Sequence, residues 1–263
     1  MQITPRFTRA LAVAAIAGLS LTACGGGADE PAATGEGGVT LLNAGKLTVC
    51  SDIPYEPFEF VRAGENVGFD MDIIAEVAKD LDAELDVIDD SFEGIQSGLS
   101  LSKCDLSISS ISITEERKAN MDFSDPYMDD DLTLIAKDGS GITDLESAKG
   151  KKVGVQSATT GAKHAADNGL DAVQFEDAGL QVQALKAGTV DAVLGNASVL
   201  AYQIKDDAQF QRVEDFATGE QLGISIKKGN TALLESVNAT LARITDDGTL
   251  EEFSTTWFGE TTE

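Results

Sequence analysis

The sequence predicts an α/β fold made of two lobes. Two observations support this prediction. Strand-like and helix-like segments alternate from Lys46 onward, in two successive series, and such an order is typical of parallel sheets covered by helices. Roughly 220 residues follow the N-terminal apolar and Gly-rich segments, which is enough for one large core or two modest ones.

The first series opens with a strand and a helix whose apolar side chains recur at helical spacing. Its segments, in order, are a strand at 46–51, a helix carrying Phe69, Ile73, Val77 and Leu81, a strand at 84–88, a helix carrying Phe92, Ile95 and Leu99, and a short strand at 105–108. Thr114 then precedes two acidic residues, so we expect it to cap a helical turn.

The second series repeats this alternation after an apolar segment at 132–136. Its segments are strands at 152–155, 172–175, 192–194 and 222–226, helices at 160–167, 180–187 and 197–203, a long amphipathic helix carrying Leu233, Leu234, Val237, Leu241 and Ile244, and a last helix near 250–257.

The N-terminus has the pattern of an export signal. Arg6 and Arg9 precede an apolar run at 10–21, and Leu21-Thr22-Ala23-Cys24 follows. This order predicts a lipoprotein signal peptide at 1–23, with Cys24 receiving diacylglycerol and becoming the first residue. An ordinary signal peptide is the alternative; a membrane span needs more apolar residues to cross about 30 Å of hydrocarbon. The Gly-rich segment 24–42 is predicted to be a flexible tether.

Composition excludes several classes of function. The formal net charge is −26, and removing residues 1–23 takes away two arginines and no acids, which gives −28. Such a polyanion repels nucleic acids and anionic lipid headgroups. His164 is the only histidine, which excludes multi-histidine metal sites. The glycines at 150–154 fit neither a phosphate-binding loop nor a dinucleotide fingerprint, and no cofactor or metal is expected.

Two cysteines, Cys50 and Cys104, remain in the folded part. An oxidising exterior favours a disulfide between them. Their register argues the other way, because Cys50 lies near the end of its predicted strand and Cys104 at the start of another. In parallel strands this offset could exceed the ~7 Å limit on the Cα separation. Both states stay open.

Five motifs in the chain resemble those of a known family. They are Ser51-Asp52-Ile53-Pro54-Tyr55-Glu56-Pro57-Phe58-Glu59-Phe60, Val67-Gly68-Phe69-Asp70-Met71-Asp72-Ile73, Ile111-Ser112-Ile113-Thr114-Glu115-Glu116-Arg117, Asp122-Phe123-Ser124-Asp125-Pro126-Tyr127, and Gly248-Thr249-Leu250 with Trp257-Phe258-Gly259. In this order and spacing, over about 46–259, they resemble the polar amino-acid branch of bacterial extracellular solute-binding proteins, the capture subunits of ABC importers.

The resemblance implies the two-lobe periplasmic-binding-protein fold, with two crossing strands joining the lobes and hinge closure around a ligand. Lobe 1 is then discontinuous. The implied bounds are 43–131 plus 226–263 for lobe 1, 136–221 for lobe 2, and 130–137 and 221–226 for the hinge. The resemblance and the N-terminus together imply a monomer, anchored by lipid to the cell membrane on its extracellular or periplasmic side, that binds an amino acid and an ABC permease.

Arg117 is the first residue we expect in the binding site. Asp52, Ser110 and Ser112 lie just past predicted strand ends, where ligands bind in open α/β sheets. Arg117 matches the family's carboxylate-binding arginine, and a guanidinium can grip a carboxylate with two parallel hydrogen bonds. Ser112 could add a hydroxyl to it. The alternative is that Arg117 pairs with a surface acid, Glu115 or Asp122.

Tyr55 and Phe92 match the family's two aromatic walls, with core packing as the alternative. Asp52 matches an acidic pocket residue that could pair with a cationic side chain or hydrogen-bond a neutral amide. A turn-capping role is the other possibility for Asp52.

Gln156, Thr159 and Thr160 follow a strand and open a helix, where free N–H groups suit an anion, although Thr159 could simply cap the helix. Asn196 departs from the family, which commonly has an acid here to neutralise the α-ammonium group. The departure leaves room for another ligand class.

Three functions are compared. The leading hypothesis is a binding lipoprotein for a polar or cationic amino acid. The second, a same-fold dehydratase, needs a general acid or base in the cleft; only Asp52 is so placed, and His164 is expected to be solvated on its helix. The third is a sensory module that reports the ligand to a receptor. A small carboxylate without an α-ammonium group is the alternative ligand.

Overall fold

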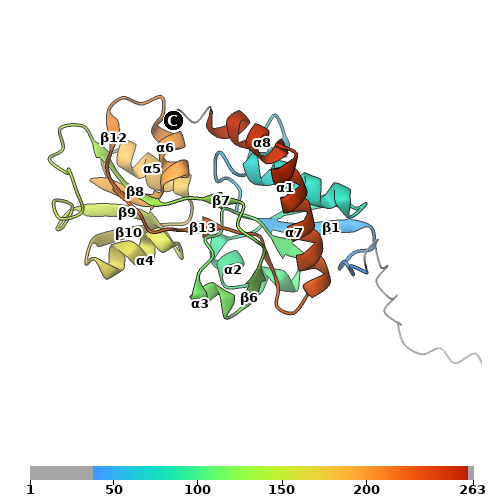
Figure 1. The fold of residues 1–263 in the computed structure, drawn as a ribbon. Helices are drawn as coiled ribbons and strands as arrows, with labels where there is room; N and C mark the ends of the chain where they lie inside the picture. Colours follow the sequence, from blue (N-terminus) through green and yellow to red (C-terminus); the bar gives the residue numbers. More distant parts are fainter. Residues whose placement is uncertain (1–37, 260–263) are drawn as a thin grey trace, which may run out of the picture. The chain divides into compact units, whose positions relative to one another are not determined.

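The computed structural model describes residues 38–259, so Cys24 and the predicted signal peptide lie outside the described part. The first lobe is built on a five-stranded sheet (Figure 1). Three of its strands are parallel, and β14 runs antiparallel to both of its neighbours. Across the sheet the strands are β4 (Glu84–Asp89), β1 (Lys46–Ser51), β5 (Leu106–Ser107), β14 (Ser225–Lys227) and β6 (Met121–Phe123).

The helices of the first lobe come from both ends of the described chain. They are α1 (Phe69–Asp80), α2 (Phe92–Gln96), the 3₁₀ helix η1 (Leu99–Ser102), α3 (Glu115–Lys118), α7 (Thr231–Asp246) and α8 (Thr249–Phe258). The apolar stripes of α1 and α7 meet in one core, where Ile73 and Val77 pack with Val237 and Leu241. Residues far apart in the sequence therefore share this core.

Val39 and Leu41 belong to the same core and are buried. The tether predicted for 24–42 therefore extends too far at its C-terminal end, because burial of two branched apolar side chains holds 39–41 against the lobe.

The second lobe is built on another five-stranded sheet. β10, β9 and β11 are parallel, whereas β8 runs antiparallel to β11 and β12. The strands are β10 (Asp171–Phe175), β9 (Lys152–Gln156), β11 (Ala192–Asn196), β8 (Leu132–Lys137) and β12 (Phe210–Phe216), with helices α4 (Thr160–Asp167), α5 (Ala178–Lys186) and α6 (Ala197–Ile204). The predicted α/β class is confirmed, but both sheets are mixed rather than purely parallel.

Two short strands lie side by side where the chain passes between the sheets (Figure 1). They are β7 (Met128–Asp129) and β13 (Gln221–Leu222), which pair antiparallel. A separate hairpin, β2 (Phe60–Arg62) and β3 (Glu65–Val67), leads into α1. The chain thus leaves the first sheet through β7 and returns to it through β13.

Two predicted elements end differently in the structure. The helix expected to carry Leu99 stops at Gln96, and Leu99 is 73% exposed on η1. The strand predicted at 222–226 is broken between β13 and β14. Gly223 lies at this break, where a Cβ atom would come within 2.7 Å of the Ile113 side chain. A larger residue here would have to displace the Ile113 side chain.

Cys50 and Cys104 form a disulfide, and the path of the chain after η1 makes it possible. Their Cα atoms lie 5.8 Å apart. Cys50 is level with Ser107 on β5, but Cys104 does not continue the line of that strand, since its N–H donates to Ser100 O in the turn of η1. The offset expected from straight parallel strands therefore does not arise.

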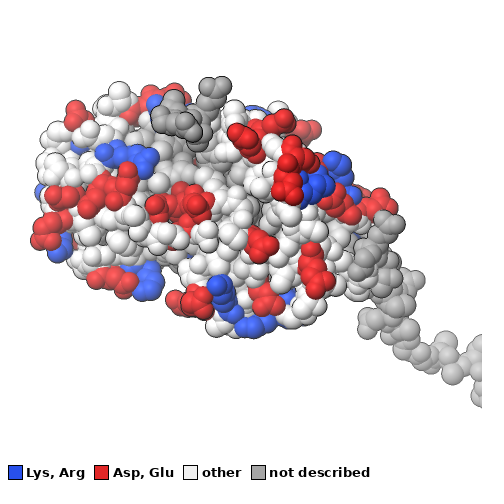
Figure 2. Space-filling view, viewed as in Figure 1, with Lys and Arg blue, Asp and Glu red and all other residues white. Residues whose placement is uncertain are grey.

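Acidic side chains are spread over much of the face drawn in Figure 2, in keeping with the net charge of −26. Within residues 38–259, no helix combines the length and the apolar character needed to cross a bilayer.

Candidate functional site

Residues from the carboxyl ends of parallel strands in both sheets meet between the lobes. Asp52 follows β1, Ser112 lies beyond β5, Gln156 ends β9 and Asn196 ends β11. Hydrogen bonds cross from one lobe to the other at this edge, and we call the residues that make them the interlobe seam. They are Asp52, Tyr55, Ser112 and Arg117 on the first lobe, Gln156, Ala158, Thr160 and Asn196 on the second, and Glu220, which bonds to both Ser112 and Thr160.

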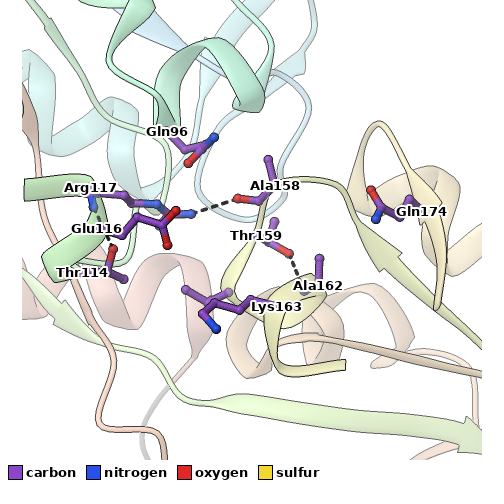
Figure 3. Close-up of a pocket in the computed structure, with 10 residues that line it drawn as sticks. Gln96, Thr114, Glu116, Arg117, Ala158, Thr159, Ala162, Lys163 and Gln174 are labelled. Atoms are coloured by element: carbon purple, nitrogen blue, oxygen red, sulfur yellow. Dashed lines mark hydrogen bonds between the residues drawn. The ribbon is translucent and has the colours of Figure 1, made fainter. Parts of the chain in front are cut away.

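Arg117 is buried in this seam and touches both lobes. Thr114 caps the short helix α3 by accepting from the Arg117 N–H at 3.2 Å. The guanidinium donates from Nη1 to Ser112 O at 2.9 Å and from Nη2 to Ala158 O at 3.1 Å (Figure 3). The same group lies 5.3 Å from the centre of the Phe92 ring.

The surface-pair alternative for Arg117 is wrong. The side chain forms no ion pair in the described part of the chain, and Glu115 pairs with Lys118 instead. Burial lowers the pKa of Arg117 to about 10, and the charge of Glu220 opposes this shift. Because its partners are neutral carbonyls, the guanidinium retains an uncompensated positive charge that suits an anion.

A cavity of about 680 Å³ opens beside Arg117 and is lined by both lobes. Figure 3 shows Arg117 reaching from α3 toward Ala158, with Thr159 and Lys163 across from it. A second space, of about 10 Å³, is lined by Tyr55, Gln156, Thr159 and Asn196 among others.

Asp52 makes one of these bonds, since Gln156 Nε2 donates to its Oδ2 at 2.8 Å. Burial raises the pKa of Asp52 to about 7, the Gln156 hydrogen bond lowers it, and neighbouring acids raise it further. The carboxyl group is therefore poised to change charge near neutral pH. The turn-capping alternative finds no support in its hydrogen bonds.

The two aromatic residues lie at different places. Tyr55 OH donates to Asn196 Oδ1 at 3.4 Å, across the seam. The Phe92 ring packs with the Cys50–Cys104 pair and under Arg117. Asn196 Nδ2 and Ser110 Oγ are buried and have no hydrogen-bond partner among the described residues. Unsatisfied buried polar groups are uncommon in folded proteins, and both of these belong to the predicted site.

Thr159 caps the N-terminus of α4, which was the alternative to a role in anion binding. Its hydroxyl accepts from Ala162 N at 3.1 Å and donates to Gln156 O at 2.7 Å, so the side chain is already occupied. Thr160 differs, because its hydroxyl donates to Glu220 Oε2 at 2.7 Å.

The structure also brings in two acids that sequence reasoning did not assign to the site. Glu59 and Asp70 are fully buried beneath the loop that carries Ser110. Ser109 Oγ donates to Glu59, while Ser110 N and Tyr127 OH donate to Asp70 Oδ2 at 2.8 and 3.1 Å. These bonds hold Ser110 at a φ of 46°, a left-handed conformation that needs such support. The sequence does hold one sign of this burial, because Glu59 lies between two aromatic residues, Phe58 and Phe60.

Glu59 and Asp70 are a pair of buried acids with raised pKa values. Burial raises the pKa of both groups, and the charge of Asp70 raises that of Glu59 further. Glu59 Oε2 and Asp70 Oδ1 have no hydrogen-bond partner among the described residues. Because two carboxylates ionise together only at high cost in such a place, we expect the pair to share one proton.

This pair predicts an unusual pH dependence of stability. The unfolded chain loses the proton near pH 4, whereas the folded pair keeps it to higher pH, so its contribution to stability is complete below pH 4 and is lost as pH rises toward 7. The slope reaches about 1.4 kcal/mol per pH unit. Urea unfolding measures this at several pH values from 5 to 8, on the unmodified protein and on Glu59→Gln. As pH rises, the free energy of unfolding of the unmodified protein should fall relative to that of the variant. A constant difference across this range would contradict the shared proton.

His164 is not solvated as expected. Its ring is half-buried on α4, 4.6 Å from the Phe216 ring centre.

Comparison with known proteins assigns the family. Residues 47–260 match the model of the bacterial extracellular solute-binding proteins, family 3. The chain belongs to this family. The predicted family is thereby confirmed, and the family is extracytoplasmic.

Similar proteins of this solute-binding family are known by sequence and by structure. The "ABC transporter arginine-binding protein 1" of Escherichia coli (strain K12) is 33% identical over 82% of this chain and 91% of its own length. The "L-cystine-binding protein TcyJ" of the same strain is 32% identical, over 95% of this chain and 93% of its own. The structure of "An ancestral arginine-binding protein bound to arginine" has a TM-score of 0.76 and 37% identity, covering 82% of this chain and 99% of that one. These relatives are named as binding proteins, and this solute-binding protein is not an enzyme.

Proposed function

We propose that this protein is the substrate-binding subunit of an ABC importer and that it captures a polar or cationic amino acid between its lobes. The observation that carries the proposal is the position of Arg117, buried in the seam with hydrogen bonds to Ser112 on one lobe and to Ala158 on the other. A guanidinium has five N–H groups, so Arg117 can keep its bonds to both lobes and donate its remaining N–H groups to a carboxylate in the seam. Binding and closure are then one event.

The predicted hinge has support in the two crossing segments. β7 and β13 pair by a short ladder, and Gln221 Nε2 adds a bond to Asp129 at 2.9 Å. On its other side β13 is bonded to the first lobe, since Ile113 N donates to Gln221 O at 2.8 Å. A hinge made of two such crossing segments allows one lobe to rotate against the other. The proposal keeps lobe 1 as 43–131 plus 226–263, lobe 2 as 136–221, and the hinge near 130–137 and 221–226.

The names of the relatives point to a polar amino acid as the ligand. Proteins named for arginine and cystine binding are similar over most of their lengths. Asp52 offers a buried carboxyl group that could receive a guanidinium or ammonium group. We therefore place the cationic side chain of the ligand against Asp52 and its carboxylate against Arg117.

The proposal includes a lipid anchor at Cys24, which lies outside the described residues. Its support is the sequence Leu21-Thr22-Ala23-Cys24 after an apolar run. Labelling of expressing cells with a radioactive fatty acid should mark the protein, and Cys24→Ala should abolish the label and release the protein from membranes. Retention of the label in the variant would place the lipid elsewhere.

A thermal-shift screen tests the proposed function. The panel contains the common L-amino acids, L-cystine and small carboxylates without an amino group. A ligand at 100 times its Kd adds about 2.7 kcal/mol to the stability of the native state, so the true ligand should raise Tm clearly. Stabilisation by carboxylates alone would favour the alternative ligand class, and no shift from any amino acid would contradict the proposal.

Asp52 predicts how binding of a cationic amino acid depends on pH. Below its pKa of about 7 the carboxyl group is neutral and cannot pair with a cation. Affinity should therefore rise by up to tenfold per unit between pH 5.5 and 7 and level off above this range. Calorimetric titrations with L-arginine at several pH values measure it, and Asp52→Asn should remove the dependence. A flat profile in the unmodified protein would remove Asp52 from this role.

A further inference from the structure

Glu220 is an acid in the seam that the predicted site did not contain. It directly precedes β13, in the segment that returns to the first lobe. Its Oε2 atom accepts from Ser112 Oγ at 2.6 Å and from Thr160 Oγ1 at 2.7 Å. Glu220 thus holds one hydroxyl from each lobe.

The charge of this carboxylate has no cationic partner. No lysine or arginine of the described chain lies within ion-pairing distance of Glu220, and its two partners are neutral hydroxyls. Arg117 is near enough that Glu220 is the charge that raises its pKa most. The hydrogen bonds of its Nη1 and Nη2 atoms nevertheless go to backbone carbonyls. A half-buried, unpaired carboxylate favours a cation beside it.

Two of the other acids near the seam are already engaged. Asp52 accepts from Gln156 at 2.8 Å. Asp130 is buried and accepts from Ser198 N at 3.0 Å and Ser198 Oγ at 2.6 Å, which ties it to the start of α6. Asn196 contributes no charge. Glu116 also lines the cavity beside Arg117, but it is exposed, whereas Glu220 is half-buried and raises the pKa of Arg117 more.

We propose that Glu220 receives the α-ammonium group of the ligand, supplying the negative charge that Asn196 lacks. This assignment rests on the proposed function, the capture of an amino acid. Ser112 gives the geometry: its carbonyl oxygen contacts Arg117 and its hydroxyl contacts Glu220. The carboxylate and ammonium groups of an α-amino acid are attached to one carbon, so a ligand gripped by Arg117 can reach Glu220 with its ammonium group. Glu220 is thus a specificity residue that selects amino acids over simple carboxylates.

The test compares ligands with and without the ammonium group. Glu220→Gln keeps the size and an acceptor oxygen but removes the charge. Calorimetry on the full folded protein would use L-arginine with 5-guanidinopentanoate, and L-glutamine with its deaminated analogue. We expect the variant to lose tenfold to several hundredfold in affinity for the amino acid that binds, and threefold at most for its deaminated partner.

Glu115→Gln serves as the matched control. It removes the same charge from α3, where the carboxylate is exposed and pairs with Lys118 at 2.9 Å, and it should change neither affinity appreciably. Equal losses for both ligands of a pair, or tighter binding of the amino acid by Glu220→Gln, would overturn the assignment. Tighter binding would mean that Glu220 competes with the ligand's carboxylate. Failure of the unmodified protein to bind either amino acid would count against the proposed function as well.

Discussion

Replacement of Arg117 by alanine is expected to weaken amino-acid binding by about 2–5 kcal/mol, or roughly 30- to 4,000-fold. The guanidinium is buried, and the carboxylate that it pairs with would be left in the seam without a cation. Calorimetry on the unmodified protein and the variant, with the amino acid that stabilises the protein most, measures this loss of binding free energy directly.

Two further variants separate charge from geometry at this position. Arg117→Lys keeps the charge but loses the two parallel donors, so most of the affinity should still be lost. Arg62→Ala removes an arginine that lies over Trp257, away from the seam, at 5.0 Å from the ring centre, and it should bind normally. Unchanged affinity in Arg117→Ala, measured on a folded protein, would refute the role of this residue.

Gly68→Ala should cause the largest loss of folding stability, roughly 3 kcal/mol or more. Gly68 has a φ of 138°, and a Cβ atom there would lie 2.0 Å from the carbonyl oxygen of Phe58. Two carbonyl groups of the Phe58 segment also accept hydrogen bonds at 3.0 Å: Pro57 O accepts from Phe69 N–H, and Phe58 O accepts from Asp70 N–H. Since neither backbone segment can move without breaking these bonds, the clash would also weaken the hydrogen bond from Ser110 N to Asp70.

The control for this prediction is Gly64→Ala. Gly64 also has a positive φ, 89°, but no atom lies within 4 Å of its Cβ position. It should cost only the conformational strain of about 1–2 kcal/mol. Urea unfolding of both variants measures the difference. Similar losses for Gly64→Ala and Gly68→Ala would contradict the steric account.

Much of the fold could be predicted from local patterns. The strand at 46–51 and the helix at 160–167 have the predicted bounds, because buried β-rich runs and capped helices are set by nearby residues. β12 was missed because Gln211, Arg212 and other exposed residues hide its pairing with β8. The antiparallel direction of β8 and β14 was missed because it depends on the two crossings, which no local pattern records.

The residues of the candidate site also fall into those that local patterns and motifs predicted and those that they did not. Strand ends and the family resemblance together pointed to Arg117, Ser112 and Gln156, all of which lie in the seam. Glu220 was not found, because it lies outside the motifs and reaches the seam only through the return crossing. Glu59 and Asp70 lie inside quoted motifs, but their shared burial depends on packing between distant segments.

The central claim is that the seam closes on the carboxylate of an amino acid held by Arg117. The most direct measurement is a calorimetric titration of the unmodified protein with the best-binding amino acid and with its α-carboxamide, in which a neutral amide replaces the negatively charged carboxylate. The carboxamide should bind at least a hundredfold more weakly, in line with the loss of a buried charge pair. Affinities within threefold of each other would contradict the claim.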